Sequence, residues 1–225
     1  MGSRLGIRAQ TVYIKALIFI FLFGIASVAS AGTLTYTLNQ DGCSSGCGTS
    51  PFGTVTLTQT GSNVNVTATL LNGDEFVRTG AGESLVFEVS GNPAITITNL
   101  TSGFTNNGPA SASTFGSFEY SIRCTGCGNG ASSPLPGPLS FTAALTGGGT
   151  LSISDFIANG SGHFFASDIL GDNNKTGNVG SSGPGVRGDG GGGSSSSAPE
   201  PPSLGLIGGS LLGLGLIGRR LRRAR

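Results

Sequence analysis

The chain has 225 residues, and its formal charge of +1 hides an uneven distribution of charge. Residues 1–31 carry three bases and no acid, residues 32–198 carry ten acids against four bases, and residues 199–225 carry five arginines against one acid. The acidic middle segment excludes a nucleic-acid-binding role, because so few basic side chains cannot neutralise a run of phosphates. Its length fits one domain with one core, and ten of the thirteen phenylalanines of the chain lie in this segment.

The first 31 residues have the three parts of a secretory signal peptide. A basic region ends at Lys15, and an apolar run and then small residues follow. Ala29 and Ala31 fit the A-x-A cleavage rule, so we expect cleavage before Gly32. An uncleaved membrane anchor is the weaker alternative, because the apolar run of about 11–15 residues is shorter than the ~20 that span a bilayer. The mature protein is therefore expected to leave the cytoplasm.

Export determines how the four cysteines are interpreted. Cys43 and Cys47 form one close pair, and Cys124 and Cys127 form another, both in glycine-rich surroundings. Outside the cytoplasm thiols are oxidised, so disulfides are the favoured interpretation. A zinc ribbon and a redox-active C-x-x-C are the alternatives, and the second lacks the βαβ context of thioredoxin-like proteins. The spacing of the cysteines does not decide their connectivity. Two local bridges and cross-links between the two turns are both alternatives.

From residue 32 to 170 the apolar residues alternate with polar ones, which predicts β-strands. The segments 54–58 and 63–70 predict a hairpin whose inward residues are Val55, Leu57, Val64, Val66, Ala68 and Leu70. The other predicted strands are 34–38, 85–89, 95–98, 118–122, 139–145, 151–156 and 163–169. Eight or nine short strands between Gly, Asn, Pro and Ser turns predict an all-β, two-sheet sandwich or jelly-roll-like body.

Residues 171–198 are rich in Gly, Ser and Asn, and they predict a flexible linker. The start of this segment also has a partial calcium-loop pattern, with Asp172, Asn174 and Thr176 at positions one, three and five and Gly177 at six. Asp168 is a possible additional ligand. Gly183 stands where a calcium loop has its bidentate glutamate, so an Asn/Gly turn is the favoured interpretation and calcium the weak alternative.

The last 27 residues have a three-part order. A proline-rich motif with Pro199, Glu200 and Pro201 comes first, and the apolar, glycine-containing stretch 204–217 follows. The chain then ends in a basic cluster of Arg219, Arg220, Arg222, Arg223 and Arg225. An apolar helix followed by arginines acts as a stop-transfer element. Fourteen residues at 1.5 Å rise cover about 21 Å of a ~30 Å bilayer core, so the helix is short for a permanent anchor.

This order resembles the sorting tail of PEP-CTERM proteins of Gram-negative bacteria. The resemblance covers residues 199–225 and implies that Pro199, Glu200 and Pro201 are the recognition signal for an exosortase. That membrane-embedded enzyme would cleave near the motif and release the body or transfer it to a surface carrier. The short, glycine-rich helix and the additional Pro202 depart from the family pattern. An ordinary C-terminal membrane anchor is the alternative.

The body offers little catalytic chemistry. Its one histidine, His163, starts a predicted strand, and no G-x-S-x-G elbow accompanies any serine. Asp74 lies in a predicted turn, and Glu83 and Glu88 are predicted to face solvent, so a glycosidase-like carboxylate pair has little support. We therefore expect no enzyme activity and no cofactor.

The sequence as a whole predicts an exported surface or extracellular-matrix protein with a structural or adhesive body. Signal peptidase and an exosortase are its expected processing partners, the inner membrane holds the precursor transiently, and exopolysaccharide is a candidate surface partner. A carbohydrate- or calcium-binding extracellular module is the alternative function, and a secreted hydrolase is a weaker one.

Overall fold

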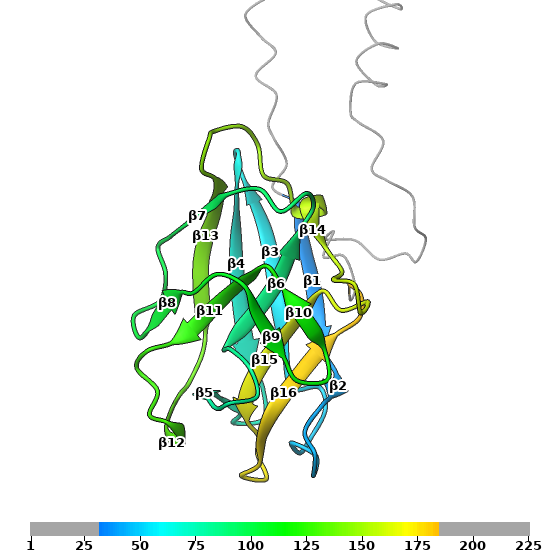
Figure 1. Cartoon of the computed structure of the whole chain (residues 1–225), viewed down its shortest axis with the longest axis vertical. Coiled ribbons are helices and arrows are strands. Elements are labelled where there is room, and N and C mark those ends of the chain that lie inside the picture. Colours follow the sequence, from blue (N-terminus) through cyan, green and yellow to red (C-terminus); the bar gives the residue numbers. More distant parts are fainter. Residues whose placement is uncertain (1–31, 185–225) are drawn as a thin grey trace, which may run out of the picture. The chain divides into compact units, whose positions relative to one another are not determined.

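A computed structural model describes residues 32–184, and this part of the chain folds almost entirely into antiparallel β-strands (Figure 1). The predicted all-β class is therefore confirmed. The bounds of the elements are β1 (Thr33–Leu38), β2 (Gln40–Asp41), β3 (Gly53–Thr60), β4 (Asn63–Leu70), β5 (Glu75–Arg78), β6 (Leu85–Val89), β7 (Ile95–Thr98), β8 (Phe104–Asn106), β9 (Ala110–Ala112), β10 (Gly116–Phe118), β11 (Tyr120–Cys124), β12 (Gly130–Leu135), β13 (Leu139–Leu145), the 3₁₀ helix η1 (Ile153–Asp155), β14 (Phe156–Ile157), β15 (Phe165–Leu170) and β16 (Thr176–Ser181).

The strands form two main sheets that pack face to face. Sheet A has the order β1-β3-β4-β13-β7, and sheet B has the order β12-β5-β15-β6-β11-β8 with β16, β2 and β14 attached. Aromatic rings join the two layers: the rings of Phe87 on β6 and Phe141 on β13 stack with centroids 5.7 Å apart, and those of Tyr36 on β1 and Phe165 on β15 meet edge to face at 4.8 Å. The core of the sandwich therefore lies between sheets A and B.

Sheet A follows the alternation in the sequence. Strands β3 and β4 pair as the predicted hairpin, from Gly53 opposite Leu70 to Thr60 opposite Asn63. The inward residues predicted for this hairpin are buried, except for Leu70, which is half-buried. The intervening threonines and asparagines face outward, as one face of a solvated antiparallel sheet requires.

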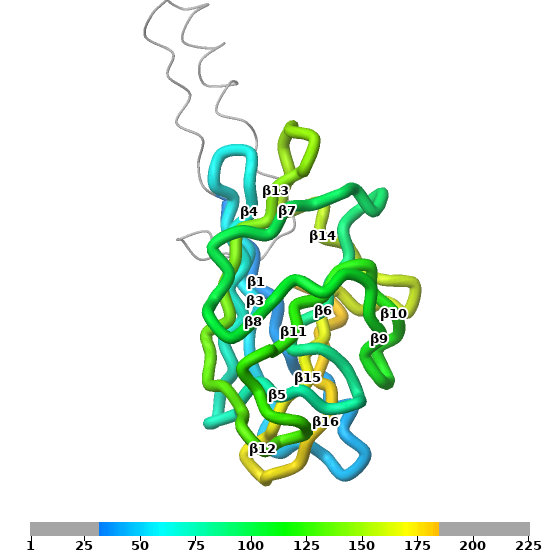
Figure 2. The backbone as a smooth tube through the Cα atoms, turned by 60° about the vertical axis from the view of Figure 1, so that its left-hand side comes forward, coloured from blue at the N-terminus to red at the C-terminus, as the bar shows by residue number. Residues whose placement is uncertain are grey.

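The central strands of sheet B, β6 and β15, are covered on both faces. The short hairpin β9–β10 packs on the outer side of β6 and β15, where Phe115 and Phe118 contact Val86 and Ala166. Figure 2 shows β9 and β10 on the opposite side of β6 and β15 from β4 and β13. All five residues of β6 are consequently buried, and so are the first five of β15.

Two carboxylates that we expected to face solvent are buried, Glu88 under this second layer and Glu83 against Arg123 and Asn107. Glu83 and Glu88 are each only 9% exposed. Glu88 lies on β6, and its carboxylate accepts a hydrogen bond from the backbone N–H of Glu119, which comes just after β10. The prediction was wrong because it assumed that sheet B has one free face.

The predicted strand 151–156 is also wrong, because its residues 153–155 form η1. The N-cap Ser152 accepts a hydrogen bond from the N–H of Ser154, and the Asp155 carboxylate accepts one from the N–H of Ser152 at 2.7 Å. Such reciprocal capping offers the backbone a helical turn in place of a strand ladder. Only Phe156 and Ile157 then pair with β6.

The predicted start of the linker at residue 171 is too early. Residues 176–181 form β16, which pairs with β15 over its whole length, and five of its six residues are buried. Glycine and asparagine fill this strand because bulkier neighbours need the space: a Cβ on Gly180 would lie 2.6 Å from the ring of Phe115. The small residues of β16 reflect close packing against a covering layer. Composition alone cannot distinguish such a buried strand from a flexible linker.

Candidate functional site

An open hollow at the edge of sheet B gathers most of the positive charge of the described body. Residues 32–184 contain nine acids and three basic side chains, Arg78, Arg123 and Lys175. Both arginines line this hollow, whose volume is about 580 Å³. Thr79, Glu83, Asn129 and Thr176 are among its other lining residues. We call this feature the arginine hollow.

One of its two arginines is neutralised by a carboxylate. Glu83 accepts hydrogen bonds from Nε of Arg123 through both carboxylate oxygens, at 3.0 and 3.1 Å, and from Nη2 at 2.6 Å. The amide of Asn107 donates a further bond to Glu83 at 3.2 Å. The hydrogen bonds and the charge of Glu83 raise the pKa of Arg123 above its ordinary value. Both residues line the hollow, and the carboxylate of Glu83 compensates the charge of Arg123.

The other arginine bonds to a neutral group. Arg78 is the last residue of β5, and its Nη2 donates a hydrogen bond to the side-chain oxygen of Asn129. The ion pair between Arg123 and Glu83 is the one found among residues 32–184, so Arg78 keeps an uncompensated charge within the described body. A guanidinium has five N–H donors, and Asn129 uses only part of this capacity.

The loop from Thr79 to Ser84 forms one rim, and buried polar groups hold it. Asp168 on β15 is fully buried, and its carboxylate accepts hydrogen bonds from the N–H and the hydroxyl of Thr79 at 2.8 and 2.6 Å. Asn178 donates to the carbonyl of Ala81 at 2.8 Å. Burial raises the pKa of Asp168, and the bonds from Thr79 oppose this shift. A Cβ on Gly82 would lie 2.4 Å from the Asn178 side-chain oxygen, so a larger residue here would force the Asn178 side chain to shift.

The Cys124–Cys127 disulfide braces the opposite rim. Cys124 ends β11, next to Arg123, and Cys127 is buried two residues before Asn129. Gly130 then begins β12 and pairs with Arg78. Its φ of +65° lies in the left-handed region that favours glycine.

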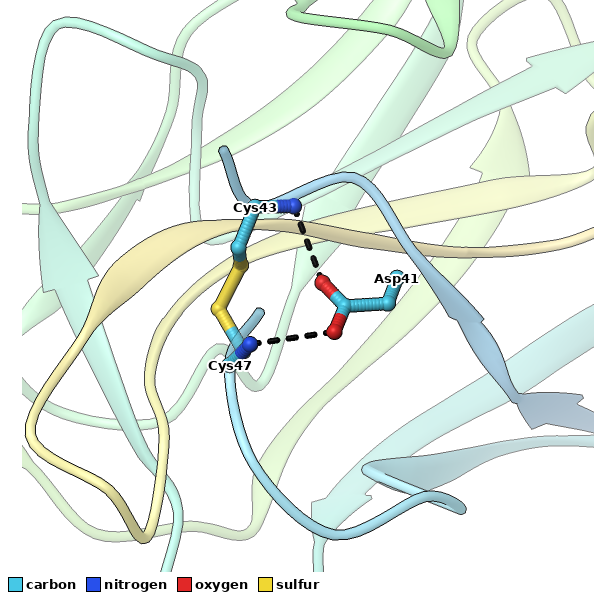
Figure 3. A group of neighbouring side chains, drawn as sticks. All are labelled: Asp41, Cys43 and Cys47. Carbon is cyan, nitrogen blue, oxygen red and sulfur yellow. Dashed lines mark hydrogen bonds between the residues drawn. A yellow bond between two sulfur atoms is a disulfide. The ribbon is translucent and has the colours of Figure 1, made fainter. Parts of the chain in front are cut away.

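The second disulfide joins Cys43 to Cys47, so both bridges are local and all four cysteines are paired. Figure 3 shows the carboxylate of Asp41 inside this loop, where it accepts hydrogen bonds from the N–H groups of Cys43 and Cys47 at 2.9 and 3.0 Å. Ligand atoms of these three residues lie within 4.8 Å of one another. Both sulfur atoms are committed to the disulfide, so this group supplies no thiolate for zinc.

The weak calcium candidates Asp172 and Asn174 lie in the turn between β15 and β16, and Thr176 is the first residue of β16. Asp172, Asn174 and Thr176 are all exposed, and Asn174 has a φ of +62°. Asp172 accepts a hydrogen bond from the N–H of Thr49 at 3.2 Å, which docks the turn against the chain that follows the Cys43–Cys47 loop. Thr176 lines the arginine hollow, and Asp168 bonds to Thr79. The structure therefore directs these side chains to different neighbours, and a calcium site here stays a prediction.

Asp74 is a buried carboxyl that the sequence placed in a simple turn. It is 5% exposed, and its two oxygens accept no hydrogen bond that meets normal geometry. Burial raises the pKa of Asp74 to about 6, a nearby N–H of Asp172 opposes this shift, and the charge of Asp172 adds to it.

His163 lies before β15, not within a strand as predicted. Its ring meets that of Phe115 edge to face at 5.0 Å, and its Nδ1 is buried without a partner. Among the hydrogen bonds of residues 32–184, none joins this ring to a serine or a carboxylate. The packing of His163 against Phe115 therefore gives it a structural position beneath the β9–β10 hairpin.

Comparison of the chain with protein-family models, with curated proteins and with solved structures gives no significant match. In the described range, no helix is long and apolar enough to cross a membrane. The predicted signal cleavage at Ala29, Ala31 and Gly32 rests largely on residues outside that range. The sorting motif at Pro199, Glu200 and Pro201 and the terminal arginine cluster lie entirely outside it.

The sequence indicated the cysteines but missed the arginine hollow. One signal was available, since Arg78 and Arg123 are the two arginines of an acidic stretch that runs from residue 32 to 184. Their meeting depends on how β5 and β11 are placed in sheet B, and strand order cannot be deduced from alternation alone.

Proposed function

We propose that this chain is an exported surface or extracellular-matrix protein whose two ends are processed by membrane machinery. The carrying observation is that the cysteines of the β-sandwich body all form disulfides, a state typical of proteins outside the cytoplasm. The basic, apolar segment before Gly32 supports removal by signal peptidase. The body then has a structural or adhesive role that needs no catalysis.

The C-terminal order supports sorting of the PEP-CTERM type. Pro199, Glu200 and Pro201 would be recognised by an exosortase in the inner membrane, while the apolar stretch and its arginines hold the precursor there. Cleavage near the motif would pass the body to the cell surface or the extracellular matrix of a Gram-negative bacterium, where exopolysaccharide is a candidate partner.

Substitution of Glu200 by alanine tests this proposal. In an exosortase-bearing Gram-negative host, we expect the wild-type chain to lose both ends and to reach the surface or the medium. The Glu200→Ala variant should lose only its N-terminal segment and stay with the membrane fraction, with release reduced about tenfold or more, because one recognition contact of this kind is worth about a factor of ten. Intact mass spectrometry of each fraction reports both cleavage sites and the number of free thiols.

Glu119→Ala is the matched control, because Glu119 is an exposed glutamate of the body. This variant should be processed like the wild type. Normal release of Glu200→Ala, or a full-length chain with four free thiols inside the cell, contradicts the proposal.

A ligand-binding body is the second candidate function, and the arginine hollow is the observation that favours it. The hollow is concave, its lining is polar, and it contains an arginine that no carboxylate of the described body neutralises. Binding and surface localisation are compatible, since the first concerns the body and the second concerns the ends.

A further inference from the structure

Arg78 is a cationic side chain with no anionic partner among residues 32–184. Its side chain lines the arginine hollow, and its bonding partner is the neutral amide of Asn129. Arg123, 45 residues further along the chain, has the opposite environment, since the carboxylate of Glu83 holds its guanidinium through three hydrogen bonds. A guanidinium with unused donors binds a carboxylate through two parallel bonds.

The rims of the hollow are held in place without any ligand. The Cys124–Cys127 bridge braces the Asn129 side, and the bonds of Asp168 and Asn178 hold the loop from Thr79 to Ser84. One oxygen of Asp168 and the side-chain oxygen of Asn178 are buried without a partner. Burying unpaired polar atoms costs stability, and the bonds that the same two side chains make hold the loop in position. A rigid rim lowers the entropy that binding would otherwise lose.

The remaining lining selects a ligand rich in hydroxyl groups. Thr79, Asn129 and Thr176 offer hydroxyl and amide groups, and Glu83 adds acceptor oxygens. The lining contains no aromatic or aliphatic side chain large enough to hold an apolar ligand. The volume of the hollow, about 580 Å³, lies within the range of about 300–1,000 Å³ typical of small-molecule sites. A single free arginine is also too little positive charge for a nucleic-acid backbone.

We propose that the arginine hollow binds a carboxylate-bearing saccharide, with Arg78 holding the carboxylate and the polar rim contacting the sugar hydroxyls. The chemical class is a hexuronate, either as a single residue or as part of an acidic polysaccharide. This inference concerns the folded body alone, so it stands or falls separately from the processing of the two ends.

Three probes separate the parts of this chemistry. The exported protein, purified with both disulfides formed, is titrated with a trimer of galacturonate, with a neutral trimer of glucose and with acetate. Isothermal titration calorimetry measures affinity, and the backbone amide signals of Gly82, Asn129 and Gly130 in ¹⁵N NMR spectra report where binding occurs. We expect the galacturonate trimer to bind with a dissociation constant of about 1 mM or tighter and to shift these signals.

Substitutions at the hollow assign the contact. Arg78→Ala should weaken binding of the galacturonate trimer about tenfold or more, because it removes a charge-assisted pair of hydrogen bonds. Asn129→Asp has nearly the same shape but places a carboxylate beside Arg78, so it should compete with the ligand and also weaken binding about tenfold. Lys175→Ala, which removes a positive charge outside the lining, should change the affinity less than about twofold.

Circular dichroism and a thiol count establish that each variant is folded. If Arg78→Ala does not fold, Asn129→Asp still decides the question. The proposal is overturned if folded Arg78→Ala or Asn129→Asp binds as the wild type does, or if no signal shifts at about 50 mM galacturonate trimer. Equal binding of acetate would reduce the hollow to a simple anion site, and equal binding of the glucose trimer would remove the role of Arg78. Either outcome overturns the saccharide assignment.

Discussion

The outer faces of the two sheets differ in how far they are exposed to solvent. The outer face of sheet A carries threonine and asparagine hydroxyl and amide groups that are partly exposed, such as Asn65, which bonds to Thr142 and Thr60. On sheet B, the outer face of the central strands is covered by the β9–β10 hairpin and by the loop after β5, so polar groups there, such as Asp168 and Asn178, are buried. Polar atoms on a covered face cannot use water as a partner, so they must bond to other protein groups. On sheet B these bonds hold the loop from Thr79 to Ser84, which is one rim of the arginine hollow.

The largest expected effect is that of Asp168→Ala on the covered face. This change leaves the half-buried N–H and hydroxyl of Thr79 without their acceptor, and we expect it to lower the free energy of unfolding by about 2–3 kcal/mol at pH 7. The substitution also removes a carboxylate whose charge is disfavoured by burial, so the net loss of stability is smaller than the loss of the hydrogen bonds alone. Urea unfolding followed by circular dichroism measures the difference.

Asp168→Asn is the matched control for that substitution. It keeps an oxygen that can accept from Thr79 and removes the charge, so its effect should be less than about half that of Asp168→Ala. An equal loss for both variants would mean that the charge, and not the acceptor, stabilises the loop.

Asp74 gives a medium effect that depends on pH. Its pKa in the folded protein, about 6, lies above the ordinary 3.8, mainly because of burial. The folded state therefore binds this proton more tightly than the unfolded state, and the stability that the proton provides is lost as the pH rises through about 6. Solvent screening in these surface loops reduces the contribution to about 1 kcal/mol between pH 4 and pH 7.

Comparison with Asp74→Asn isolates this contribution. The variant cannot titrate at this position, so it should gain about 1 kcal/mol relative to the wild type between pH 4 and pH 7. Parallel profiles for the wild type and Asp74→Asn would contradict the elevated pKa of Asp74.

The smallest effect is expected on the solvated face of sheet A. Asn65→Ala removes two side-chain hydrogen bonds, but water can replace both at a partly exposed position. We expect a change of less than about 0.5 kcal/mol in the free energy of unfolding, measured in the same urea titrations. A loss as large as that of Asp168→Ala would remove the contrast between the two outer faces.

The same contrast explains which elements could be predicted. The β3–β4 hairpin and β13 were predicted nearly to the residue, because a strand with one wet face must alternate. Strand β16 and the burial of Glu88 were not, because a second covering layer removes alternation and admits glycine, asparagine and carboxylates. The candidate calcium residues and His163 were identified as residues, but the neighbours that determine their roles come from other strands.

The sequence by itself determined the all-β class, the pairing of the central hairpin and the expectation of disulfides. These follow from local periodicity and from the chemistry of exported thiols, which need no knowledge of distant contacts. Tertiary structure alone decided that both disulfides are local, that β16 belongs to the body, and that Arg78 lies in a hollow with Arg123. Each of these depends on which strands become neighbours and on what covers their outer face, and such long-range packing leaves no periodic signature along the chain.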